Sequence, residues 1–327
     1  MHMMKITEAQ VFLTRECNLS CGYCNLTCKK LHELDFNGWK RGFTAMAAAG
    51  IKTVKILGGE PTVKLWLPEL IRYSEHLGIR TALLSNSTFD DEMFQRLLDS
   101  GLTGYYASVD GLGEIQHFDA QTAGKAAGGY AMLKRLQSHR IPLLAANTVI
   151  HRKNYREVPE LVNRLSEEGF FINLCTVQHN REGGREFSKP DTGKDLRFFP
   201  EDREEVENVA RKLVALQREG VRISVPERYL AEMPKYGIEC NWQCTDMAQL
   251  RVDADGAVML CNEYRTRLAK RYNVADPCFP AADLQPLLYD WRQVRESLGC
   301  SGCYWSCFIQ AEENLRHRRL EFGFVSE

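Results

Sequence analysis

The sequence lacks a run of about 18 apolar residues, which is the length that a helix needs to cross a bilayer. Its N-terminus also lacks the apolar core of a secretory signal peptide. An excess of charge is missing too, because 42 Lys and Arg stand against 43 Asp and Glu. Such a balanced chain creates no field that would gather nucleic acid or anionic lipid. These absences predict a cytoplasmic protein that has neither a membrane nor a nucleic acid as a partner.

Cysteine, by contrast, is abundant, with 12 residues in a chain of 327. In a reducing compartment such cysteines favour metal or redox chemistry over disulfides. Four of them lie within residues 17–28, seven lie within 240–307, and Cys175 stands alone between the two groups. The distribution predicts two cysteine-based sites, one near each end of the chain.

Short apolar segments alternate with amphipathic helical segments from residue 8 to about residue 176. Six of these segments are expected to be buried strands: 9–14, 52–57, 79–85, 103–109, 142–150 and 171–177. Strands that alternate with helices form parallel sheets with right-handed crossovers. Six units are too few for a closed barrel of eight strands, so the pattern predicts a partial (β/α)6 TIM-like barrel. Its ligands are expected at the carboxyl ends of the strands.

The alternation of apolar and amphipathic segments ends after the sixth expected strand. Residues 179–202 are polar and lack periodicity, which is typical of a substrate-covering loop or of an exposed connection. A helix at 203–218 and a short strand at 221–225 are expected next, and then a hairpin that turns at Asp255 and Gly256. We therefore expect an α/β chain with a barrel domain at 1–200, a linker helix and strand at 201–238, and a small cysteine-rich α+β domain at 239–327.

The first cysteine group follows directly from the first expected strand. Cys17, Cys21 and Cys24 have the spacing C-x3-C-x2-C, and the loop opens at the face where such barrels keep their chemistry. From spacing alone, a zinc site that is closed by Cys28 is an open alternative. The segment Gly58-Gly59-Glu60-Pro61 follows the second strand. Two glycines let the backbone come close to a ligand, and their amide and carbonyl groups, with Glu60, can satisfy an ammonium and a carboxylate.

This pair of motifs resembles the radical S-adenosylmethionine (SAM) superfamily, and the resemblance covers about residues 9–177. It implies that the three thiolates hold a [4Fe-4S] cluster whose open iron binds the amino and carboxylate groups of SAM. One electron from the cluster then breaks a C–S bond, and the 5′-deoxyadenosyl radical takes hydrogen from the substrate. The implied cofactors are SAM and this cluster, with flavodoxin or ferredoxin as a reducing partner.

The resemblance also assigns roles to single residues. Tyr23 stands where the family has an aromatic residue that contacts the adenine, and Gly58, Gly59 and Glu60 match the segment that receives the SAM amino group. Positions that resemble contacts to the ribose or the methionine part are Ser85, Asn86, Ser108, Asp110 and Asn147. The alternatives are capping of helices or strand ends for the polar residues, and ordinary packing for Tyr23.

The second cysteine group resembles the twitch domain, a shortened relative of the SPASM domain in one radical SAM branch. Its pattern runs from Cys244 over 11 residues to Gly256, over four more to Cys261, and then to Cys300 and Cys303. The resemblance implies an auxiliary [4Fe-4S] cluster that these four cysteines hold. The C-x2-C-x3-C run that ends at Cys307 departs from the full SPASM pattern, so only one auxiliary cluster is expected.

Some alternatives in the second group stay open. Cys240 fits the spacing to the glycine almost as well as Cys244 does, and Cys240, Cys278 and Cys307 are left without a role. A zinc site that uses the same cysteines is the alternative to an iron–sulfur cluster.

Three functions are compatible with these residues. The first is a radical SAM oxidoreductase that oxidises its substrate with the help of the auxiliary cluster. The second is an epimerase in which Cys175, Cys28 or Cys240 returns a hydrogen atom to the substrate. The third is a non-catalytic iron–sulfur or zinc protein. Peptide-modifying members often carry a leader-binding domain before the barrel, and a first cysteine at position 17 leaves no room for it. This favours a small-molecule substrate, and a peptide substrate is the alternative.

Overall fold

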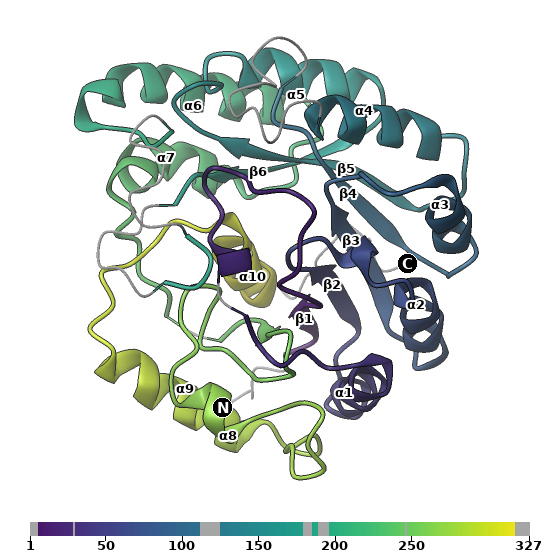
Figure 1. Cartoon of the computed structure of the whole chain (residues 1–327). Helices are drawn as coiled ribbons and strands as arrows, with labels where there is room; N and C mark the ends of the chain where they lie inside the picture. The colour runs from purple at the N-terminus through teal and green to yellow at the C-terminus, as the bar shows by residue number, and fades with distance from the viewer. Residues whose placement is uncertain are drawn as a thin grey trace.

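Seven parallel strands form one curled sheet, around which the rest of the chain is arranged (Figure 1). The computed structural model describes residues 6–28, 30–111, 125–178, 185–188, 196–245 and 247–317. The strands are β1 (Glu8–Phe12), β2 (Thr53–Leu57), β3 (Arg80–Ser85), β4 (Gly104–Ser108), β5 (Leu143–Ile150), β6 (Phe171–Thr176) and β7 (Leu250–Val252). Their order in the sheet is β6-β5-β4-β3-β2-β1-β7. The partial barrel and its six expected strands are therefore confirmed.

Helices follow the strands, and α2 to α5 lie along the outer side of the curled sheet (Figure 1). Those of the barrel region are α1 (Phe36–Ala48), α2 (Leu67–His76), α3 (Asp91–Leu98), α4 (Lys125–Leu136) and α5 (Val158–Glu167). The later helices are α6 (Arg203–Arg218), α7 (Glu227–Glu239), α8 (Leu268–Arg271), α9 (Gln285–Ser297) and α10 (Ser306–His317). Asp35 and Asp90 cap α1 and α3 by accepting hydrogen bonds from Gly38 N and Met93 N. The sheet and helices thus give the α/β architecture that the sequence predicts.

The strand β7 is the first arm of the expected hairpin, but the sequence does not reveal that it joins the barrel sheet. It pairs in parallel with β1, so that Ala9, Gln10 and Val11 face Leu250, Arg251 and Val252. The expected turn at residues 255 and 256 is present, since Gly256 has a φ of 82° and its N–H donates to the carbonyl of Asp253. The expected strand at 221–225 is wrong, because it is reduced to a single bridge between Ile172 and Ile223.

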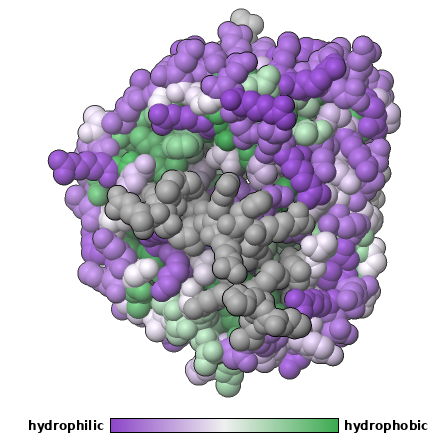
Figure 2. All heavy atoms as spheres, turned by 180° about the vertical axis from the view of Figure 1, so that it is seen from behind, coloured by the Kyte–Doolittle hydropathy of each residue, from purple (hydrophilic) through white to green (hydrophobic). Residues whose placement is uncertain are grey.

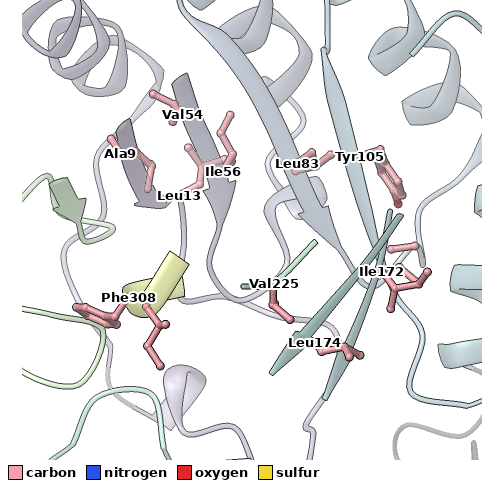
Figure 3. Close-up of a cluster of buried hydrophobic side chains, with 14 of the residues drawn as sticks. Ala9, Leu13, Val54, Ile56, Leu83, Tyr105, Ile172, Leu174, Val225 and Phe308 are labelled. Atoms are coloured by element: carbon pink, nitrogen blue, oxygen red, sulfur yellow. The ribbon is translucent and has the colours of Figure 1, made fainter. Parts of the chain in front are cut away.

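The main core lies between the outer face of the sheet and its helices. Alternate residues of the strands, such as Ala9, Leu13, Val54, Ile56 and Leu83, point into it and are buried (Figure 3). The residues between them point to the inner, concave face, where Gln10 on β1 and Lys55 on β2 are register partners. Because a strand alternates its faces, burial of the outer set fixes which side chains face the inside of the barrel.

A buried ion network joins the end of β1 to the segment after β7. Arg15 donates to both carboxylate oxygens of Asp253, at 3.1 and 2.6 Å, and pairs with Glu186 at 2.9 Å. Asp253 also pairs with Arg265, and its side chain is fully buried. The network fixes the start of the first cysteine loop against the cysteine-rich region. The boundaries at residues 200 and 238 stay predictions, since β7 of the last region completes the sheet of the first.

Replacing Asp253 with asparagine is expected to lower the free energy of unfolding by about 3 kcal/mol. The reason is that removal of one partner leaves the buried charge of Arg15 with only Glu186. Anaerobic urea unfolding measures the change. Glu227→Gln is the matched control, because its pair with Arg218 is exposed and is expected to contribute little. Equal unfolding midpoints for the two variants would contradict a stabilising role for the network.

The face opposite to that in Figure 1 is mostly hydrophilic wherever its side chains are described (Figure 2). Hydrophobic surface is confined there to smaller areas between polar side chains. None of the helices in the described part of the chain is long and apolar enough to cross a membrane.

Candidate active site

A cavity opens at the carboxyl ends of the barrel strands, where the sequence predicts it. It contains about 1370 Å³ of empty space, counted out to its open mouth. Its lining comes from the first cysteine loop, from β1 to β6 and from the start of α10, which Figure 1 shows below β6 inside the curve of the sheet. We call it the main cavity.

All three cysteines of the first loop line the main cavity. Cys17, Cys21 and Cys24 are half-buried, and the loop between them crosses the ends of β1 and β2. The base of the loop is fixed by Glu33, which accepts hydrogen bonds from the hydroxyl of Thr14 and from Arg15 N. Three thiols are therefore held together at the cavity wall.

Gly58 and Gly59 allow the two loops above β1 and β2 to come close to each other. A Cβ atom on Gly58 would lie 2.3 Å from the carbonyl oxygen of Thr14, and one on Gly59 would lie 2.0 Å from that of Glu16. Gly59 N donates to Thr14 O and Glu60 N donates to Glu16 O, both at 2.8 Å. Both glycines line the main cavity, as expected. The close approach of the cysteine loop also requires both positions to lack a side chain, and the sequence alone does not reveal this requirement.

Glu60 ties the end of β2 to the end of β3. Its Oε1 accepts hydrogen bonds from Ser85 Oγ at 2.9 Å and from the hydroxyl of Thr62 at 2.7 Å, and its Oε2 accepts one from Asn86 N at 2.7 Å. Burial raises the pKa of Glu60 above its usual value, although the hydrogen bonds from Asn86, Thr62 and Ser85 act in the opposite direction. The carboxylate thereby positions Ser85 and Asn86, both of which line the main cavity.

Tyr23 also lines the main cavity, and its hydroxyl lies 3.4 Å from Asp110 Oδ2. Burial raises the pKa of Tyr23, and the nearby charge of Asp110 raises it further. Asp110 accepts a hydrogen bond from Val149 N at 2.8 Å and does not line the main cavity. The structure thus brings Tyr23 to the cavity and places Asp110 behind it.

Three further polar side chains lie side by side on β4, β5 and β6. Ser108, Asn147 and Asn173 are register partners, and all three line the main cavity. Asn173 Nδ2 donates to Asn147 Oδ1 at 2.6 Å. Ser108 and Asn147 were expected there, and Asn173 was missed. The signal for Asn173 is its spacing from Cys175, because residues two apart on a strand face the same side.

A second cavity, with about 420 Å³ of empty space, holds the later cysteines, and we call it the auxiliary cavity. Cys244, Cys261, Cys300 and Cys303 all line it, as the twitch resemblance implies. Burial raises the pKa of Cys261 to about 12 and also raises the pKa values of Cys244 and Cys303. Without metal these thiols hold their protons, and metal binding must displace them.

The described residues contain no preformed site for a single metal ion. In the part of the chain that the structure describes, no three His, Cys, Asp or Glu side chains are close enough together to hold one metal ion. A [4Fe-4S] cluster is larger than one zinc ion, and its thiolates lie farther apart. The side chain of Cys28, on which the zinc alternative depends, lies outside the described residues.

The remaining described cysteines differ in whether they line a cavity. Cys175 lines the main cavity. Cys240 lines neither cavity, because it ends α7 in the left-handed conformation with its thiol 3.9 Å from Gly237 O. Cys278 is exposed. Cys307, to which the sequence gave no role, lines the main cavity beside Trp305.

Comparison with known proteins shows which protein family this chain is similar to. The model of the radical SAM superfamily matches residues 11–165. The chain is 32% identical over 178 residues to a PqqA peptide cyclase from Rhodopseudomonas palustris, which covers 51% of this chain and 46% of that protein. It is also 30% identical over 160 residues to the Fe-coproporphyrin III synthase from Methanosarcina barkeri. This second match covers 48% of this chain and 40% of the synthase. The chain thus spans less than half the length of these two relatives.

Solved structures share the fold over a larger part of the chain. SuiB from Streptococcus suis, bound to S-adenosylmethionine, has a TM-score of 0.63 and 16% identity, and the match covers 93% of this chain and 73% of SuiB. The enzyme anSMEcpe, with bound AdoMet and the Cp18Cys peptide, has the same score and identity over 95% of each chain. At this identity the likeness establishes the fold. The match over residues 11–165 shows that this part of the chain is similar to the radical SAM superfamily.

Proposed function

We propose that the protein is a radical SAM oxidoreductase that acts on a peptide and uses an auxiliary [4Fe-4S] cluster. One observation carries the proposal: Cys17, Cys21 and Cys24 line the same cavity as Gly58, Gly59 and Glu60. Three thiols at the wall of one cavity suit a cluster with one iron left open for SAM.

In this proposal the three cysteines hold the first cluster, and the strand ends hold SAM. Gly58 and Gly59 offer backbone groups to its methionine part, Tyr23 offers a ring to the adenine, and the polar side chains that complete the binding site are Ser85, Asn86, Ser108 and Asn147. When bound there, SAM and the cluster supply one-electron cleavage of the sulfonium and removal of hydrogen from the substrate. The buried strand ends keep water away from this chemistry.

Asp110 has a supporting role in the proposal. Since it lies behind Tyr23 rather than at the cavity wall, it orients the Tyr23 hydroxyl and does not contact SAM. Glu60 acts in the same way, because its carboxylate oxygens accept hydrogen bonds from Thr62, Ser85 and Asn86. Both residues therefore hold in place other residues that form the proposed SAM site, Asp110 through Tyr23 and Glu60 through Ser85 and Asn86.

The auxiliary cavity is assigned to a second [4Fe-4S] cluster, held by Cys244, Cys261, Cys300 and Cys303. Four thiolates leave no open position for a substrate, so this site serves electron transfer. A substrate radical that gives up one electron ends oxidised, either with a new double bond or with a new bond to the oxidised carbon. A flavodoxin or ferredoxin is the proposed electron donor for the first cluster.

The relatives favour a peptide over the small molecule that the sequence suggested. One relative is named a PqqA peptide cyclase, and anSMEcpe was solved with a peptide. The main cavity supports this choice, because it extends from the first cysteine loop to Trp305 and Cys307 of the cysteine-rich region. An extended substrate can contact both regions at once.

The test is anaerobic incubation of the reconstituted protein with SAM and dithionite. We expect 5′-deoxyadenosine well above the level that is found without protein, because the open iron of the first cluster is the site of SAM cleavage. No 5′-deoxyadenosine above background would favour a non-catalytic iron–sulfur or zinc protein instead.

An epimerase is the second candidate, and the position of Cys175 in the main cavity favours it. Heavy water separates the two functions. An epimerase incorporates deuterium from its thiol into the product, whereas an oxidoreductase releases a more oxidised product that contains none. Of the other two thiols considered, Cys240 lines neither cavity, and the side chain of Cys28 lies outside the described residues.

A further inference from the structure

Arg251 lies in the wall between the main cavity and the auxiliary cavity. It stands on β7 opposite Gln10 of β1, and its exposed fraction is only 2%. Its guanidinium group lies 3.5 Å from the ring centre of Phe308, which lines the auxiliary cavity. On the other side it contacts Asn262 and Cys307, which line the main cavity. One side chain therefore adjoins both cavities.

Arg251 is a buried cation without a carboxylate partner among the described residues. Its Nε donates to Asn262 Oδ1 at 3.0 Å, its Nη1 donates to the carbonyl of Gln249 at 3.3 Å, and its Nη2 lies 3.8 Å from Cys307 Sγ. Arg15, by comparison, pairs with Asp253. A buried charge is costly unless an opposite charge compensates it, so the position of Arg251 calls for an anion nearby.

The thiols of the auxiliary cavity can provide that negative charge. Phe308, which packs against the guanidinium of Arg251, lines the auxiliary cavity together with Cys244 and Cys261, and Asn262, which Arg251 contacts, directly follows Cys261 in the chain. Arg295 also lies close to Cys244, but its side chain is nearer to solvent, which screens its charge. Arg251 is therefore a deeply buried cation beside the auxiliary cavity.

The hydrogen bonds of Arg251 also organise the wall of the main cavity. Asn262 accepts from Arg251 through Oδ1 and donates through Nδ2 to Cys307 Sγ, at 3.7 Å. Cys307 thus receives two N–H groups, one from Arg251 and one from Asn262. Gln10, the register partner of Arg251, lines the same cavity, and its buried Oε1 has no hydrogen-bond partner. This unsatisfied acceptor points to a ligand or water that donates a hydrogen bond beside Cys307.

We propose that Arg251 is a positioning residue that raises the reduction potential of the auxiliary cluster and holds Asn262 and Cys307 in the wall of the main cavity. The inference rests on the proposed function, because it takes Cys244, Cys261, Cys300 and Cys303 as ligands. Each electron that enters a cluster makes it more negative, and a buried positive charge stabilises that form more than the oxidised form. Cys307 is a part of the cavity wall and not a ligand.

The test is a redox titration of the auxiliary cluster, followed by electron paramagnetic resonance under anaerobic conditions. A Cys17/Cys21/Cys24→Ala background leaves only the auxiliary signal. Arg251→Met and Arg251→Gln remove the charge, and we expect each to lower the reduction equilibrium constant at least tenfold, which is 59 mV for one electron. Arg251→Lys keeps the charge and is expected to stay within threefold of the unchanged background.

Two controls separate this effect from general damage. Arg271→Met removes an exposed cation that pairs with Asp290, and we expect no change in potential. Cys307→Ala is expected to keep the full iron content, and loss of iron would show that Cys307 is a ligand and would overturn its assignment to the cavity wall. Arg251→Gln keeps a side chain that can bond Asn262, which makes the test independent of the folding of Arg251→Met.

The outcomes also separate the inference from the proposed function. A reduction equilibrium constant within twofold of the background in Arg251→Gln would overturn the inference while leaving both clusters in place. Failure of the wild-type protein to bind iron at the auxiliary site would overturn the assignment of the four cysteines, and with it the proposed function.

Discussion

Replacing Cys17, Cys21 and Cys24 together by alanine is expected to remove half of the iron and all of the SAM cleavage. The wild-type protein, reconstituted anaerobically, should bind about eight irons, and the variant should bind about four, because each [4Fe-4S] cluster contains four. The measurements are iron and sulfide content and the yield of 5′-deoxyadenosine. The effect is large because the three thiols that line the main cavity are the proposed ligands of the only open iron.

Cys278→Ala is the matched control for this variant. Its thiol is exposed, and the variant should retain both the iron content and the cleavage. Equal iron in the triple variant and the wild-type protein, or bound zinc in place of iron, would refute the assignment of the first cluster. Bound zinc would make Cys28 the candidate for the fourth ligand.

Replacing Cys261 and Cys303 by alanine is expected to remove the other half of the iron while SAM cleavage continues. About four irons should remain, and they should belong to the first cluster. Both thiols line the auxiliary cavity, and without them only Cys244 and Cys300 remain there as thiol ligands among the described residues. Iron analysis and the yield of 5′-deoxyadenosine measure the two parts of this expectation.

Cys240→Ala tests the competing ligand. Because Cys240 lines neither cavity, this variant should bind the full amount of iron. A loss of four irons in Cys240→Ala, together with full iron in a Cys244→Ala variant, would reverse the choice that the structure suggests between these two cysteines.

Local patterns were sufficient for most of the barrel. Each of the strands β1 to β6 is a short apolar segment that is followed by an amphipathic helix, and periodicity identifies such segments without any knowledge of their neighbours. The cysteine loop and the glycine segment could be placed together because both follow strands of one parallel sheet. Parallel strands bring their carboxyl ends to the same edge.

Features that depend on contacts between distant segments could not be predicted. The strand β7 has only three residues, and it becomes a strand because β1 offers an open edge. Cys307 is separated by a few residues from Cys303, yet the two thiols face different cavities. The need for Gly59 follows from a carbonyl of Glu16, which no pattern in the sequence reveals.

The pairing of β7 with β1 has a consequence for the order of events during synthesis. Ala9 and Leu250 are neighbours in the sheet, although about three quarters of the chain separates them. While the ribosome is still making the middle of the protein, one edge of the first strand has no partner, and contacts of such wide separation form slowly. Completion of the half-barrel sheet therefore waits until the last quarter of the polypeptide, which begins just before β7, starts to emerge.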